Sequence, residues 1–246
     1  GVSFAKALSL ALDKPLIDVN HMKAHILAHF IEDNNMDTPQ FPFLCLTVSG
    51  GHTQIVEVQS PYDMKVIGTT IDDAAGEAFD KAAKMIGIDY PGGPELDRIA
   101  EQGNPDKFSF SKPRIAELDF SFSGLKTSIL YNLRDWVKED SDFIAKNKID
   151  LCASIRKSIV DILISKIIMA SKKTGIMTIA IAGGVSANRA LRRSLSKMEK
   201  DGFKVHVPKF EYCTDNAAMV AIAGKFAFDQ GDFATQDMAA DPRLKW

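Results

Sequence analysis

The alternation of apolar and polar residues in the first half of the chain predicts three short strands. Residues 43–49 and 52–58 have the composition of strands, and Gly50-Gly51 between them is typical of a tight hairpin turn. Residues 64–69 favour a third strand. Because the connections between these segments are short, the three strands can pair antiparallel.

Shorter elements are expected before these strands. Helical apolar spacing runs up to Leu12 and stops at Asp13-Lys14-Pro15. Residues 16–19 are typical of a short strand, and a second helix is expected after Asn20.

The second half of the chain alternates helices with strands. The expected helices are residues 72–87, a segment after Pro91-Gly92-Gly93-Pro94, and residues 149–173, 186–200 and 214–228. The expected strands are residues 177–184, an apolar run suited to burial on both faces, and 204–209. Residues 107–123 have no period and are expected to form a packed loop. This order predicts the α/β class, with a mixed sheet flanked by helices.

Composition and charge narrow the class of protein. With 246 residues, 46% of them hydrophobic and 25% charged, the chain has a globular composition and room for a sizeable core. Its longest apolar stretch, residues 159–170, is interrupted by Asp161, Ser165 and Lys166, so no membrane span is expected. The net charge of -2 provides no global field for a polyanion, and contact with nucleic acid has to be local or supplied by partners.

The cysteines and the first residues indicate the compartment. Cys45, Cys152 and Cys213 are far apart in sequence and match no CxxC pattern, which favours a reducing environment. The first residues lack the basic region, continuous apolar core and cleavage site of a signal peptide. We therefore expect a cytoplasmic protein.

Three histidines with helical spacing form the first candidate site. His21, His25 and His29 are four residues apart, which places their imidazoles on one helix face within reach of a common ion. The alternative interpretation is a solvated helix face. The pattern is not the HExxH motif of zinc peptidases, because Met22 occupies the position of the general-base glutamate.

Three glycine turns form the second candidate site. Gly50-Gly51 lies between Ser49 and Thr53, whose hydroxyls can bind an anion together with the free N–H groups of the turn. Pro91-Gly92-Gly93-Pro94 and Ala182–Asn188 each come directly before an expected helix, where phosphate or ribose oxygens are favoured. A plain hairpin turn remains the alternative for the first of them.

Carboxylates are concentrated between these turns. Asp72 and Asp73 are expected to stabilise a helix N-terminus, whereas Asp80 lies one turn further along, next to Glu77, and needs another explanation. Asp97 lies on the following helix, and Asp215 precedes the last expected helix. For Asp215 the alternatives are an acidic residue near a helix N-cap and a metal ligand.

Taken together, several sequence blocks resemble the signature of one enzyme family. The blocks are VNHMKAH, TVSGGHTQIVEV, IDDAAGEAFDKAAKMIGIDYPGGPELDRIA, FSFSGLKT, IAGGVSANRALR and YCTDNAAM. They follow one another along almost the entire chain, as in the TsaD family of tRNA N6-adenosine threonylcarbamoyltransferases, formerly called O-sialoglycoprotein endopeptidases. The resemblance implies the actin-like ATPase fold of sugar kinases, Hsp70 and actin, built from two RNase H-like lobes with a nucleotide between them.

The same resemblance implies how the chain is divided. Residues 1–40 would be the remnant of the first lobe with the metal-binding helix, residues 41–213 the second lobe, and residues 214–246 a helix and tail that return toward the first lobe. The strand and Gly-Ile-Glu-Thr-Ser-Cys-Asp type block with which family members usually begin do not precede Gly1. The first lobe is therefore expected to be incomplete and the chain N-terminally truncated, and its activity alone is in question.

The resemblance also implies which residues form the site. It makes His21, His25 and Asp215 the ligands of one divalent metal ion, with iron favoured and zinc possible, and leaves His29 out of the set. It implies no catalytic residue such as a general base. The residues that it assigns to substrate or nucleotide binding are Thr47, Val48, Ser49, Gly50, Gly51, Asp80, Gly93, Asp97 and Asn188.

The implied reaction transfers the threonylcarbamoyl group from threonylcarbamoyl-adenylate to N6 of adenine 37 in tRNAs that read codons beginning with A. The implied partners are tRNA, the smaller paralogue TsaB and the P-loop ATPase TsaE. Two alternatives remain, a non-catalytic nucleotide-binding scaffold of the same complex and a small-molecule kinase. A local basic set could serve tRNA, although a solvated helix face is favoured for it: Arg189, Arg192, Arg193, Lys197, Lys200 and Lys204.

Overall fold

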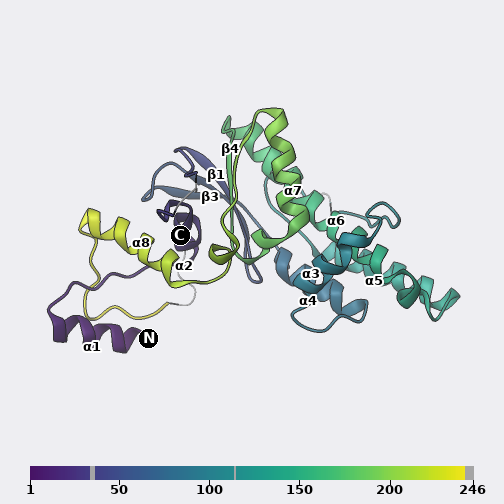
Figure 1. The fold of residues 1–246 in the computed structure, drawn as a ribbon, viewed down its shortest axis with the longest axis horizontal. Coiled ribbons are helices and arrows are strands. Elements are labelled where there is room, and N and C mark those ends of the chain that lie inside the picture. Colours follow the sequence, from purple (N-terminus) through teal and green to yellow (C-terminus); the bar gives the residue numbers. More distant parts are fainter. Residues whose placement is uncertain (34–36, 114, 242–246) are drawn as a thin grey trace.

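A mixed sheet forms the centre of the molecule. The computed structural model describes residues 1–33, 37–113 and 115–241. The strands are β1 (Phe43–Val48), β2 (Thr53–Val58), β3 (Met64–Thr69), β4 (Thr178–Ala182) and β5 (Lys204–His206). They follow the order β3-β2-β1-β4-β5, with antiparallel pairing of β1 to β2 and β2 to β3 and parallel pairing of β1 to β4 and β4 to β5 (Figure 1). The predicted mixed α/β sheet is confirmed.

Strand β1 is buried along its entire length because both faces of the sheet are covered. Leu44 and Leu46 belong to the larger hydrophobic core, whereas Phe43 and Cys45, with the opposite side-chain direction, belong to a smaller cluster on the other face. Burial raises the pKa of the Cys45 thiol far above its ordinary value, so this cysteine is a packing residue.

One face of the sheet carries the larger core. Its helices are α3 (Ala75–Met85), α4 (Gly92–Ile99), α5 (Ser123–Glu139), α6 (Phe143–Thr174) and α7 (Arg189–Met198). Helix α6 runs through this layer and contacts α3, α4, α5 and α7. It ends at Gly175, which adopts the left-handed conformation that terminates helices.

The opposite face carries a thinner layer. Helices α2 (His21–Leu27) and α8 (Ala217–Gln230) pack against each other beside the sheet, with Ala24, Leu27 and Met219 buried between them. Helix α1 (Val2–Leu12) lies at the outer end of this side and buries none of its residues (Figure 1). The segment that follows residue 214 thus packs against the first 40 residues, while residues 242–246 lie outside the described residues.

The structure corrects three details of the sequence prediction. Residues 16–19 form no regular strand, since Leu16 makes only an isolated bridge to Ala234. Helix α5 was not predicted. It begins at Ser123 because the carboxylate of Asp72 accepts hydrogen bonds from the Phe122 and Ser123 N–H groups, so Asp72 caps α5 and not the helix that follows it in sequence.

Among the residues that the structure describes, no helix is long and apolar enough to cross a bilayer.

Candidate functional site

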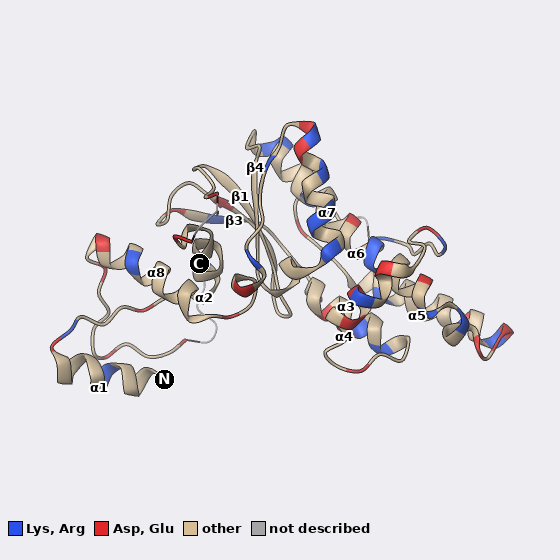
Figure 2. Cartoon of the chain, in the orientation of Figure 1, with Lys and Arg blue, Asp and Glu red and all other residues tan. Residues whose placement is uncertain are grey.

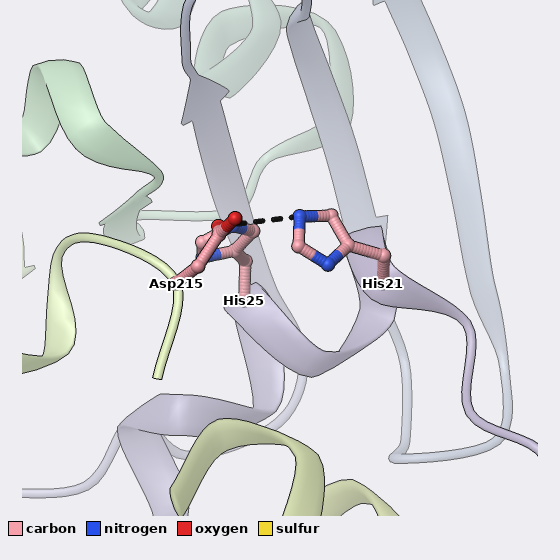
Figure 3. Close-up of side chains that lie close together, drawn as sticks. All are labelled: His21, His25 and Asp215. Atoms are coloured by element: carbon pink, nitrogen blue, oxygen red, sulfur yellow. Dashed lines mark hydrogen bonds and ion pairs between the residues drawn. The ribbon is translucent and has the colours of Figure 1, made fainter. Parts of the chain in front are cut away.

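Two histidines and one aspartate from opposite ends of the chain meet beside the sheet. His21 and His25 project from α2, and Asp215 precedes α8 (Figure 3). Oδ1 of Asp215 lies 3.1 Å from Nε2 of His25 and 3.4 Å from Nε2 of His21. The three ligand atoms lie within 4.8 Å of one another, which is close enough to share one ion.

Helix capping places these side chains. The Asn20 carboxamide accepts hydrogen bonds from the N–H groups of Met22 and Lys23, so α2 begins at His21 and the two histidines, four residues apart, share a face. Asn216 caps α8 in the same way by accepting from Met219 N–H at 2.8 Å. Asp215 therefore lies just outside a helix end, where its carboxylate can turn toward α2.

The electrostatics of the group suit metal ligands. His25 is almost fully buried, and its pKa is lowered first by desolvation and then by the neighbouring His21, although Asp215 opposes the shift. The imidazole is therefore neutral near pH 7, as coordination requires. The Asp215 side chain is 77% exposed, so one side of the group faces solvent. Two imidazole nitrogens and one carboxylate oxygen with an open side are a donor set that fits zinc or non-haem iron.

His29 lies outside this group. The helix tightens into a 3-10 turn at Ala28–Phe30, and the helical face shared by His21 and His25 does not continue to His29. Its Nε2 lies 2.9 Å from the carbonyl oxygen of Ile181 in β4, and burial lowers its pKa to about 4. His29 is thus a neutral link between the thin layer and the sheet.

A cavity of about 610 Å³ reaches the segment that carries Asp215. This volume is within the range of small-molecule sites. Its wall is formed by residues from all three glycine turns together with carboxylates, and Thr214 belongs to the same wall. Because Thr214 directly precedes Asp215, one short segment contributes both to the cavity wall and to the histidine–aspartate group. The sequence-predicted residues in the wall are Gly50, Asp80, Gly93, Asp97 and Asn188.

The polar residues of the wall are held in place by hydrogen bonds to backbone N–H groups and to a buried arginine. Asp80 Oδ1 accepts a hydrogen bond from Gly93 N–H at 2.8 Å, in the first turn of α4. Asp97 accepts from the buried Arg156 guanidinium at 2.9 Å through Oδ1, and from Arg189 N–H at 3.3 Å through Oδ2. Asn188 caps α7. Each carboxylate oxygen keeps lone-pair capacity for a ligand hydroxyl.

Most of the predicted site residues in the first hairpin lie outside the cavity wall. Thr47 and Val48 are fully buried in β1, and the Thr47 hydroxyl donates to the carbonyl of Gln54. Ser49 Oγ accepts from the His52 N–H at 3.0 Å and shapes the turn. Of the five predicted hairpin residues, the cavity wall contains Gly50, while Gly51 lies beside it in the same turn.

A close backbone approach fixes this turn. Gly76 in α3 donates a backbone hydrogen bond to the Ser49 carbonyl, and a Cβ at Gly76 would lie 2.6 Å from that oxygen. Only a residue without a side chain permits this contact. Local sequence did not indicate it, because the contact joins segments that are distant in the sequence.

Sequence analysis also missed the role of Arg192. Its guanidinium donates to the carbonyls of Ser186 at 2.7 Å and Pro208 at 2.8 Å, and it lies 4.0 Å from the centre of the Phe210 ring. Arg192 therefore joins the turn before α7 to the loop that leads to Asp215, instead of belonging to an exposed basic face. In the sequence, only the position of Arg192 one helical turn after Asn188 indicates that its side chain lies near the turn before α7.

Comparisons with known structures define the class of protein. The chain superposes on full-length HypF, solved in a phosphate- and nucleotide-bound form, with a TM-score of 0.66 over 93% of this chain and 38% of HypF, at 16% identity. HypF from T. kodakarensis gives 0.65 over 93% of this chain and 39% of that protein, at 14% identity. The chain therefore shares the fold of HypF, and the actin-like ATPase fold that the family resemblance implied is confirmed.

Sequence comparison defines the family. The profile of TsaD, tRNA N6-adenosine threonylcarbamoyltransferase, matches residues 1–222. The transferase of Christiangramia forsetii is 55% identical over all of this chain and 73% of its own length, and that of Thermosipho africanus is 45% identical with the same coverage. This chain belongs to the TsaD family and is a tRNA N6-adenosine threonylcarbamoyltransferase by that membership.

Proposed function

We propose that the chain transfers a threonylcarbamoyl group from threonylcarbamoyl-adenylate to N6 of adenine 37 in tRNA. The adenylate occupies the 610 Å³ cavity, and the threonylcarbamoyl group extends toward His21, His25 and Asp215. The observation that carries this proposal is that one segment, Thr214-Asp215, contributes to both the cavity wall and the histidine–aspartate group. HypF, which shares the fold, has been solved with phosphate and nucleotide, and this supports a nucleotide in the cavity.

The cavity wall provides groups suited to an adenylate. Helices α4 and α7 both begin at this wall, so the positive ends of their dipoles favour the phosphate. Asp80 and Asp97 accept hydrogen bonds from ribose hydroxyls, while the Gly93 N–H and the Arg156 guanidinium that already bind these carboxylates fix their direction. Gly50 and Gly93 leave space for close approach of the ligand.

His21, His25 and Asp215 hold one divalent ion in this proposal, iron in preference to zinc because of the family resemblance. Such an ion supplies Lewis acidity toward a carbonyl oxygen of the donor. Burial keeps the His25 imidazole neutral and available, and the exposed side of Asp215 leaves room for the donor. The positive ends of the α4 and α7 dipoles stabilise the phosphate of the departing AMP.

The remaining functional assignments follow from the family. We propose that the chain works with the smaller paralogue TsaB and the P-loop ATPase TsaE, in the cytoplasm. We also propose the division into residues 1–40, 41–213 and 214–246. The packing of α8 on α2 supports the return of the last segment to the first one.

The metal proposal is tested with variants of exposed ligands, which leave the core intact. His21→Ala and Asp215→Ala are compared with Lys23→Ala, a change on the same helix outside the ligand set. In the full-length enzyme with its partner proteins, we expect about one divalent ion per chain, lost in both ligand variants together with at least about 100-fold of the transfer rate. Metal-free wild-type enzyme with full activity, or ligand variants as active as Lys23→Ala, would contradict the assignment.

The adenylate proposal has an independent test. Asp80→Asn keeps an acceptor for Gly93 N–H but removes the anionic acceptor of a ribose hydroxyl, so AMP should bind about tenfold more weakly by calorimetry. The exposed Asp106→Asn serves as the matched control. Equal AMP affinity of the two variants would contradict the placement of the ribose.

A further inference from the structure

One face of α7 carries basic residues that the proposed chemistry does not use. Arg189, Arg193 and Lys197 follow one another at intervals of four residues, and Lys200 continues the row in the 3-10 turn Glu199–Asp201. All four are exposed, whereas Leu191, Leu195 and Met198 point into the core from the opposite face. We name these four residues the basic stripe. Figure 2 shows Lys and Arg positions recurring along α7.

Ion pairing divides the stripe into one paired and three unpaired residues. Several exposed lysines elsewhere bind carboxylates, such as Lys112 with Asp161 and Lys146 with Asp140. Within the stripe, Arg193 binds Glu101. Hydrogen bonds from Arg193 and Arg156 lower the pKa of Glu101 to about 2. Among the described residues, Arg189, Lys197 and Lys200 have no carboxylate within ion-pair distance, although Glu199 and Asp201 lie in the same turn as Lys200.

The stripe begins at the cavity. Arg189 belongs to the cavity wall, and the helix carries the row away from it for about 16 Å, at 1.5 Å per residue over eleven residues. The N-terminal end of the α7 dipole, which favours anions, also lies at the cavity. A polyanion whose reacting base approaches the donor bound in the cavity would therefore place its neighbouring phosphates along unpaired positive charge.

We infer that the basic stripe binds the phosphate backbone of tRNA next to the modified adenosine. The inference rests on the transferase activity of the family and adds to it the surface on which tRNA lies. The inference is compatible with the net charge of -2. A chain without an overall positive charge can still bind a polyanion through a local row of cations. Arg192 does not belong to this surface, since its guanidinium binds carbonyls within the protein.

The test separates tRNA binding from chemistry. Lys197→Gln/Lys200→Gln is compared with Lys14→Gln/Lys65→Gln, which removes two exposed lysines from other parts of the described surface. In the full-length enzyme with its partner proteins, the dissociation constant of tRNA is measured over a series of salt concentrations. Transfer is measured with tRNA varied, and AMP affinity is measured in parallel.

We expect the stripe variant to bind tRNA about tenfold more weakly at physiological salt. The slope of log affinity against log salt should become shallower by about 2, since each lysine neutralises about one phosphate. kcat at saturating tRNA and AMP affinity should stay at the wild-type values. A dissociation constant and slope equal to those of the control would overturn the inference, as would weaker binding of a partner protein with unchanged tRNA binding. Failure of the wild-type enzyme to modify tRNA would instead contradict the function itself.

Discussion

The two faces of the sheet support the two parts of the site in different ways. The cavity wall is built largely on the thick layer, which is the helical layer that carries the larger core. There, α3, α4, α6 and α7 share this core with β1 and β4. The histidine–aspartate group depends on the thin layer, where α2 and α8 meet over a small cluster around Met219. The proposed nucleotide site therefore rests on a well-packed frame, and the proposed metal ligands rest on one helix–helix contact.

This difference predicts that the two parts of the site can be weakened separately. A defect in the thick layer should weaken both parts of the site, because the thick layer supports the sheet and the sheet supports both parts. A defect in the thin layer should change only the position of Asp215 relative to α2. Four changes, from the largest expected effect to the smallest, test this asymmetry.

Loss of core volume in the thick layer should have the largest effect. Leu163 in α6 is fully buried in the larger core, so Leu163→Ala should lower the free energy of unfolding by about 4 kcal/mol. Chemical denaturation monitored by circular dichroism measures the change. Leu130→Ala, at a position 47% exposed, should change it by less than about 1 kcal/mol. Similar losses in both variants would show that the larger core does not dominate stability.

The buried link between the layers should make stability depend on pH. The pKa of His29 is about 4 in the folded chain and near 6.5 when unfolded, so between these values the unfolded chain binds more protons. Stability is therefore retained above pH 6.5 and falls by about 3 kcal/mol as the pH drops to 4. His29→Gln can still donate to the Ile181 carbonyl but does not titrate. Denaturation midpoints across this window should decline less in that variant, and identical profiles would contradict the assignment.

A cavity in the thin layer should affect the metal ligands selectively. Met219 is buried between α8 and α2, and its N–H group is bound by Asn216, next to Asp215. Met219→Ala should cost about 2 kcal/mol of local packing and weaken metal binding by about tenfold. AMP affinity should remain unchanged by calorimetry. Equal loss of metal and AMP affinity would show that the two layers do not act separately.

The smallest effect should come from the turn that borders the cavity. A methyl group at Gly76 would collide with the Ser49 carbonyl oxygen, and the hairpin turn would have to move. Gly76→Ala should weaken AMP binding by about tenfold, or about 1.4 kcal/mol, without loss of bound metal. Gly231→Asn, at a helix end with positive φ far from the cavity, serves as the control. Unchanged AMP affinity in Gly76→Ala would separate this turn from the site.

Local patterns in the sequence were sufficient for much of the architecture. The three antiparallel strands and most helices were predicted because alternation with period 2 or 3.6 reports directly which side of an element is buried. The pairing of His21 with His25 also follows from spacing alone, since residues four apart share a helix face. The resemblance of ordered sequence blocks supplied Asp215, the family and the fold.

Tertiary structure alone decided the contacts between distant segments. Asp215 reaches a histidine 190 positions earlier because α8 packs on α2, and Asp72 caps a helix that begins about 50 residues later. Arg192 turns inward because the carbonyls of Ser186 and Pro208 converge on it. Periodicity describes one element at a time, whereas these contacts depend on how elements pack on both faces of a buried sheet. The sequence therefore determined the elements and the candidate ligands, and the packing decided which of them meet.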